Sequence, residues 1–144
     1  MENNKITLRL IVMNFLQFAV WGAYLTSMGS FLSGAGMSQQ IWLFFATQGF
    51  ASIFMPALVG IVADKWIPAQ KVLSICHALA GAFMLGSGIY AMGAGPDISF
   101  GTFYALYALS VAFYMPTIAI SNSVAYAALE GAGKDPVKSF PPIR

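Results

Sequence analysis

Long runs without charged residues constrain the fold of this chain more than any other feature. Asp, Glu, Lys and Arg are all absent from residues 10–63, 72–96 and 98–129. A membrane-spanning helix needs about 20 predominantly apolar residues. The first run is long enough for two such helices, and each of the others is long enough for one. The sequence therefore predicts four transmembrane helices.

The composition excludes the main soluble classes. Hydrophobic residues make up 58% of the chain and charged residues only 8%, with a mean hydropathy of +0.73. So few polar side chains cannot cover a water-soluble domain, and a disordered chain carries much less apolar surface. The 7 Lys and Arg residues form no basic patch, so we expect no nucleic-acid partner. A single cysteine, Cys76, excludes an internal disulfide and a cysteine-based metal site.

Glycine, serine and charged residues divide the apolar runs. We expect an all-α integral membrane protein with helices over about residues 6–32, 39–63, 72–92 and 99–129. A charged loop at 64–71 separates the second and third helices. A polar loop follows at 130–140, before the expected start of a fifth helix.

The basic residues predict the orientation. With four spans, all seven fall on one side of the membrane: Lys5, Arg9, Lys65, Lys71, Lys134, Lys138 and Arg144. The positive-inside rule places that side, and both chain ends, in the cytoplasm. The first apolar stretch is longer than the core of a signal peptide and three further spans follow. We therefore interpret it as an uncleaved span.

Two helix faces carry polar side chains that could line a transport path. On the fourth helix the spacing places one set on a single face: Tyr107, Ser110, Tyr114, Thr117 and Ser121. These hydroxyls could form the wall of a hydrophilic cavity or could serve helix packing. Pro116 interrupts the same helix and favours a kink, a feature found near transporter sites.

The second face lies on the first helix, where Gln17, Trp21 and Tyr24 follow one another at helical spacing. Their amide and aromatic groups suit a planar ligand that forms hydrogen bonds. Ordinary contact between helices would use the same side chains.

On the third helix, one face carries Ser74, His77, Gly81 and Gly88. Small residues favour close helix packing. His77 is the only histidine, and an ionisable residue within a span is a functional candidate. Proton handling and a packing role, with one backbone partner, both remain open for it.

Catalytic constellations are absent from the sequence. No paired carboxylates lie within a span, and neither a histidine cluster nor a phosphate-binding glycine loop occurs. We therefore expect neither an enzyme nor a bound metal or cofactor.

A short motif stands between the second and third helices. Gly60 is followed one turn later by Asp64 and Lys65, on the predicted cytoplasmic side. This resembles the G-x-x-x-D-[RK] loop of the major facilitator superfamily. The resemblance implies a conformational-switch loop at these three residues, although the usual closing Gly-Arg-Lys portion is replaced by residues 66–71.

A more specific resemblance covers nearly the whole chain. It is carried by residues 15–18 (FLQF), 21–22 (WG), 54–66 (FMPALVGIVADKW), 75–77 (ICH), 114–117 (YMPT) and 140–144 (FPPIR). These segments are similar to those of the bacterial nucleoside:proton symporters, which include nucleoside and xanthosine permeases.

The resemblance implies the N-terminal part of a twelve-helix major facilitator fold. It also implies proton-coupled uptake of nucleosides across the bacterial inner membrane by alternating access, with a nucleoside and a proton as the transported species. The lipid bilayer and the remaining helices of the same transporter would be its surroundings. By the same resemblance, Arg144 opens the fifth helix and contacts the nucleoside. With the two polar faces, the candidate substrate-binding set is Arg144, Gln17, Trp21, Tyr114 and Thr117.

Two alternatives remain open from the sequence. One keeps the superfamily and changes the cargo to a sugar, a drug or another small metabolite. The other is a complete four-helix membrane scaffold protein or small exporter. Small exporters usually carry a carboxylate within the first helix, and this helix has none.

Overall fold

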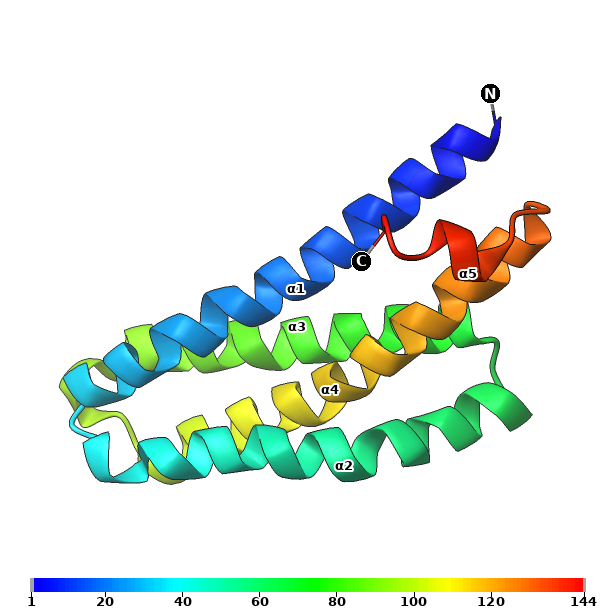
Figure 1. The fold of residues 1–144 in the computed structure, drawn as a ribbon. Helices are drawn as coiled ribbons and strands as arrows, with labels where there is room; N and C mark the ends of the chain where they lie inside the picture. Colours follow the sequence, from blue (N-terminus) through cyan, green and yellow to red (C-terminus); the bar gives the residue numbers. More distant parts are fainter. Residues whose placement is uncertain (1, 144) are drawn as a thin grey trace.

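Four long helices make up most of this protein (Figure 1). The computed structural model describes residues 2–143, with side chains described from residue 5 onward. The long helices are α1 (Glu2–Gly34), α2 (Ile41–Lys65), α3 (Ala69–Ala94) and α4 (Phe100–Gly131). Three short helices occupy the connections: η1 (Ser38–Gln40), η2 (Gly95–Asp97) and α5 (Pro136–Ser139).

Each long helix is long and apolar enough to cross a membrane. The candidate spans in the described residues have 28 to 32 residues and mean hydropathies of 1.5 to 1.7. The prediction of an all-α membrane protein with four spans is therefore confirmed.

The connection between α2 and α3 is shorter than expected. The charged residues at 64–71 predicted a loop, whereas α2 continues to Lys65 and α3 begins at Ala69. Charged side chains are compatible with a helix that leaves the apolar layer, so helical structure continues past the end of the apolar run. Pro68 precedes α3 with φ of −53° and ψ of 136°, and its missing N–H costs nothing at a helix start.

The expected loop at 130–140 contains the one-turn helix α5. Asp135 caps this turn, because its side chain accepts a hydrogen bond from the backbone N–H of Val137. Pro136 occupies the first position of the turn, where its fixed φ suits a helix.

The first turns of α1, the last turns of α4 and the helix α5 lie at the same end of the molecule as the turn between α2 and α3 (Figure 1). We call this the charged end, because the six described basic residues all lie there: Lys5, Arg9, Lys65, Lys71, Lys134 and Lys138. At the opposite end η2 joins α3 to α4, and Asp97 is the one charged residue of η2.

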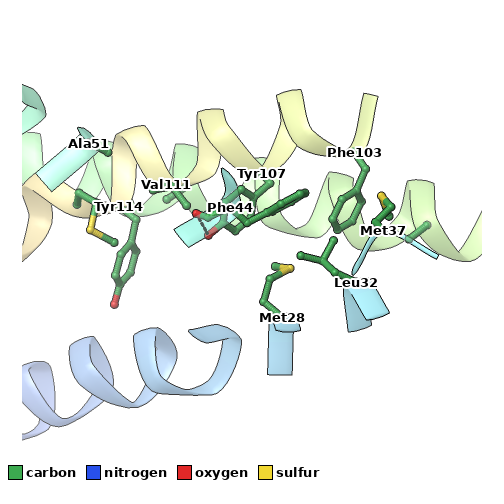
Figure 2. Close-up of a cluster of buried hydrophobic side chains, with 12 residues drawn as sticks. Met28, Leu32, Met37, Phe44, Ala51, Phe103, Tyr107, Val111 and Tyr114 are labelled. Atoms are coloured by element: carbon green, nitrogen blue, oxygen red, sulfur yellow. Dashed lines mark hydrogen bonds between the residues drawn. The ribbon is translucent and has the colours of Figure 1, made fainter. Parts of the chain in front are cut away.

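An aromatic and aliphatic cluster fills the space between the helices toward the opposite end (Figure 2). Phe44 of α2 and Tyr107 of α4 are fully buried there, with ring centroids 4.8 Å apart. Leu32 extends the cluster to α1. The packing in this region sets the position of α4 relative to α2.

A second cluster holds the C-terminal segment against α1 at the charged end. Phe140 and Ile143 pack with Leu10 of α1 and Leu129 of α4. The Nζ atom of Lys134 donates a hydrogen bond of 2.6 Å to the hydroxyl of Thr7, which adds a polar tie between the same segments.

Candidate functional site

Gln17 of α1 lies at the centre of a hydrogen-bonded group that joins three helices. Its Nε2 atom donates to the hydroxyl of Thr117 at 2.7 Å, and its Oε1 atom lies 2.8 Å from Nε2 of His77. The hydroxyl of Tyr114 donates to the backbone carbonyl of Gln17. Gln17 and Thr117 are both buried. The structure therefore brings together three of the predicted substrate-binding residues, Gln17, Tyr114 and Thr117.

His77 reaches this group from α3 and contacts it on two sides. Its Nδ1 atom lies 3.0 Å from the backbone carbonyl of Leu73, one turn earlier in the same helix. Its ring meets the ring of Tyr114 edge-on, with 6.0 Å between the centroids. His77 thus has the backbone partner expected for packing and a side-chain partner besides.

Trp21, another predicted substrate-binding residue, belongs to a separate hydrogen-bonded chain. Its indole N–H donates to Oε1 of Gln48 at 3.1 Å, and Nε2 of Gln48 donates to the hydroxyl of Tyr107 at 2.9 Å. Tyr107 in turn donates to the backbone carbonyl of Phe44 at 3.2 Å. The sequence interpretation missed Gln48, although it is the only amide side chain in α2. A lone amide side chain within an apolar span is a detectable signal.

The predicted polar face of α4 is buried along its whole length. Its five residues have no more than 5% exposure: Tyr107, Ser110, Tyr114, Thr117 and Ser121. The hydroxyl of Ser110 donates to the carbonyl of Ala80 on α3 at 2.8 Å, and that of Ser121 to Ile118 in its own helix at 3.0 Å. In this structure the face mainly serves packing, and Ser110 and Tyr114 also border a cavity.

Two adjoining cavities separate α1 from α3 and share Val20, His77 and Tyr114. One has a volume of about 250 Å³ and includes Gln17 in its lining. The other has a volume of about 310 Å³ and includes Tyr24 and Gly81. The buried hydroxyl of Tyr24 has no hydrogen-bond partner among the residues that the structure describes.

The small residues of α3 do not support close helix contact in this structure. A Cβ atom added at Gly81 or Gly88 would meet no atom within 4 Å among the described residues. Both glycines lie on the exposed side of α3 and border cavities. The expected close packing at these two glycines is therefore absent from the described part of the chain, whereas His77 on the same face contacts α1 and α4.

A separate cavity, of about 440 Å³, lies on another flank of α1. It is lined by Asn14 together with Pro142 and Ile143, the two residues before Arg144. Asn14 is buried and its Nδ2 atom donates to the carbonyl of Leu10 at 3.2 Å, while its Oδ1 atom has no partner among the described residues. Arg144 itself lies outside the described residues. Pro142 and Ile143, which precede it, line this cavity, whereas Gln17 and Tyr114 line one of the cavities between α1 and α3.

The Gly60, Asp64 and Lys65 motif occupies the last turns of α2 at the charged end. Asp64 and Lys65 are exposed, and the one ion pair found in the described residues joins Lys138 to Asp135 at 3.8 Å. A Cβ atom at Gly60 would meet no atom within 4 Å among the described residues, so no close backbone contact occurs at this glycine in the described part of the chain. No group of three or more metal-ligating side chains occurs in residues 2–143.

Comparison with known proteins gives a consistent result. A family model described as "Nucleoside H+ symporter" matches residues 4–144. The xanthosine permease of Escherichia coli K12 is 39% identical over 143 residues, covering 97% of this chain and 32% of that protein. The nucleoside permease NupG of the same organism is 41% identical over 144 residues, with the same coverage.

A solved structure gives the same result for the fold. A crystal structure of the nucleoside transporter NupG superimposes with a TM-score of 0.84 at 35% sequence identity, over 96% of this chain and 33% of that one. The chain thus spans about a third of the length of the proteins that it matches.

Proposed function

This chain belongs to the nucleoside H+ symporter family, and from that premise we propose that the protein containing it takes up nucleosides together with protons. The observation that carries the proposal is the match of residues 4–144 to the family model. The family and the matched relatives are transporters rather than enzymes, and the chain is part of a multi-pass membrane protein.

We propose that the chain forms the N-terminal part of a twelve-helix transporter of the major facilitator superfamily, which works by alternating access. Its coverage of about a third of its relatives supports this, because four spans are a third of twelve. The remaining helices would complete the transport path.

The proposed location is the bacterial inner membrane, with the charged end in the cytoplasm. The clustering of all six described basic residues at that end supports this orientation under the positive-inside rule. We propose that Gly60, Asp64 and Lys65 act there as the conformational-switch loop. Asp64 and Lys65 are exposed, so they can contact other helices of the transporter.

For the substrate site we propose Arg144 as a direct nucleoside contact. A guanidinium presents several fixed N–H donors, which suit ribose hydroxyls and base carbonyls. The preceding residues, Pro142 and Ile143, line a cavity of about 440 Å³ together with Asn14, whose Oδ1 atom has no described partner. A polar group of the ligand could bind that oxygen.

The remaining proposed contacts are Gln17, Trp21, Tyr114 and Thr117. Gln17 and Tyr114 border the cavities between α1 and α3, which supports a polar and aromatic wall there. In this structure Thr117 is fully buried and bonds to Gln17, and Trp21 bonds to Gln48, so both would have to exchange these partners to contact the ligand.

The test is uptake of labelled uridine or adenosine by cells that express the full-length protein, with and without an uncoupler. We expect the uncoupler to abolish uptake of the labelled nucleoside and unlabelled nucleosides to reduce it by competition. Uptake that persists with the uncoupler refutes the coupling, and competition by sugars or drugs alone refutes the cargo.

Arg144→Ala in the same protein tests the site. Loss of a charge-assisted contact costs about 1.5–3 kcal/mol, so the Kd for nucleoside should rise at least about tenfold. Lys138→Ala is the matched control, because Lys138 is a basic residue of the same segment with a highly exposed side chain. Equal effects of the two substitutions would reduce Arg144 to a topological anchor.

A further inference from the structure

Both ring nitrogens of His77 point at carbonyl oxygens. Nδ1 lies 3.0 Å from the backbone oxygen of Leu73, and Nε2 lies 2.8 Å from Oε1 of Gln17. A carbonyl oxygen only accepts hydrogen bonds, and a neutral imidazole has only one N–H to donate. With the Gln17 amide in this orientation, both contacts are hydrogen bonds only when His77 carries a proton on each nitrogen, and with the amide rotated a single proton is enough.

In that cationic state every hydrogen bond runs in one direction. His77 donates to Leu73 and to Gln17, and the amide nitrogen of Gln17 donates to the Thr117 hydroxyl at 2.7 Å. The hydroxyl of Thr117 then donates its own proton to the carbonyl of Tyr114 at 2.5 Å. Each of these four contacts pairs a donor with an acceptor in this state.

Loss of one proton reverses this path. The carbonyl of Leu73 is fixed in the helix, so Nδ1 keeps its proton and Nε2 becomes an acceptor. The Gln17 amide must then rotate by about 180° so that its nitrogen faces His77. Its oxygen now faces Thr117, whose hydroxyl has to donate to it and leave the Tyr114 carbonyl.

The surroundings leave this proton without a competing charge. No Asp, Glu, Lys or Arg lines the two cavities that border His77. The titratable groups that face it are Tyr114 from α4 and Tyr24 from α1. On α3 itself, Cys76 packs into a different cluster, with Val72 and Ile120. In the described part of the chain, the imidazole of His77 therefore bonds to two neutral carbonyl groups and faces no charged side chain.

The last member of the path lies next to Pro116, where α4 lacks a backbone N–H. Hydroxyl bonds from Thr to a carbonyl in the preceding turn bend helices. Moving the Thr117 hydroxyl away from the Tyr114 carbonyl therefore changes the hydrogen bonding of α4 at its proline.

We propose that His77 is a proton-binding positioning residue, whose protonation state sets the direction of the hydrogen bonds through Gln17 and Thr117 and so the local geometry of α4 at Pro116. The step transfers one proton from a hydronium ion to the lone pair of Nε2, which leaves a water molecule and adds one positive charge to the ring, and no covalent bond breaks within the protein. The role of this protonation in transport rests on the proposed function, because proton-coupled transport requires a helix geometry that changes when a proton binds.

The direct test is nitrogen NMR of the full-length transporter in lipid nanodiscs with ¹⁵N-labelled histidine. Signals of His77 are assigned by their loss in His77→Gln. Imidazoles titrate between about pH 5 and pH 8, so spectra are compared at these two limits. We expect both nitrogens to be protonated at the acidic limit, and Nδ1 alone at the basic limit. A neutral ring protonated on Nε2, or the same state at both limits, overturns the proposal.

A binding measurement tests the coupling to the transporter. We expect the nucleoside Kd of the wild-type protein to differ by about fivefold or more between the two pH limits, the lower range for coupled sites. His77→Gln keeps a hydrogen-bonding side chain and cannot titrate, so it should remove that difference. Thr117→Val should remove it too, whereas Thr117→Ser, which keeps the hydroxyl, should retain it.

Ser74→Ala is the control for a change on α3, because Ser74 is exposed and, among the described residues, its hydroxyl bonds only to the carbonyl of Gln70 in the preceding turn. It should leave the ratio of the two Kd values unchanged. A His77→Gln protein with the wild-type ratio overturns the inference, even where uptake stays sensitive to an uncoupler. Loss of that sensitivity in wild-type cells would instead refute the proposed function and leave the NMR result standing.

Discussion

Gln48 offers the sharpest test of the polar contacts that hold α1 to the rest of the bundle. Gln48→Leu keeps a similar volume and removes two hydrogen bonds, one from Trp21 and one to Tyr107. Tyr107 keeps its bond to the Phe44 carbonyl. The indole N–H of Trp21 loses its acceptor, so the substitution leaves one donor without a partner.

The size of the effect follows from side-chain hydrogen bonds measured in membranes, which average about 0.6 kcal/mol and reach about 1.7 kcal/mol. Two such bonds give an expected loss of about 1–3 kcal/mol for Gln48→Leu. Only the bond between Trp21 and Gln48 is shared by both residues. A double-mutant cycle of Gln48→Leu with Trp21→Phe should therefore give a coupling energy of about 0.6 kcal/mol.

The assay is reversible unfolding of the full-length protein in mixed micelles, with the free energy of unfolding measured for the wild type, both single variants and the double variant. Ser27→Ala is the control, because the Ser27 hydroxyl is exposed and, within the described part of the chain, bonds only to carbonyls of its own helix. A coupling energy of zero, with Gln48→Leu as stable as the control, would show that this chain of hydrogen bonds does not fix α1.

Further predictions concern packing and topology. Leu129→Ala, at a side chain with 0% exposure, should lower the unfolding free energy by about 2–5 kcal/mol in the same micelle assay, whereas Leu85→Ala, at 69% exposure, should cost about 0.5 kcal/mol or less. Equal losses would contradict the assigned burial. In a background without other cysteines, Val137→Cys at the charged end should react with a membrane-impermeant maleimide only after spheroplasts are permeabilised, and Met92→Cys toward the opposite end should react before. The reverse pattern would invert the proposed orientation.

The number of spans could be predicted from sequence because it depends on a one-dimensional property. Apolar runs and the positions of Lys and Arg indicate where the chain can cross a bilayer, and the structure has helices at those places. Helix ends were less predictable. Lys65 belongs to α2 and Ala69 to α3, because a charged residue ends an apolar run without ending a helix.

The contacts between polar faces could not be predicted in the same way. Helical spacing placed Gln17 on one face of α1 and Thr117 on one face of α4, but spacing within a helix does not determine which faces meet. Their contact spans 100 positions of sequence, and that of His77 with Gln17 spans 60. These pairings depend on how the helices pack, which only the structure supplies.

The wide separation between Gln17 and Thr117 has a consequence for biosynthesis. A ribosome adds about 5–20 residues each second, so about 5–20 s pass between the synthesis of Gln17 and that of its partner 100 positions later. During that interval α1 carries an amide with no hydroxyl to bind. Until α4 arrives, the amide nitrogen of Gln17 must therefore find another acceptor, while its oxygen can already meet His77 of α3.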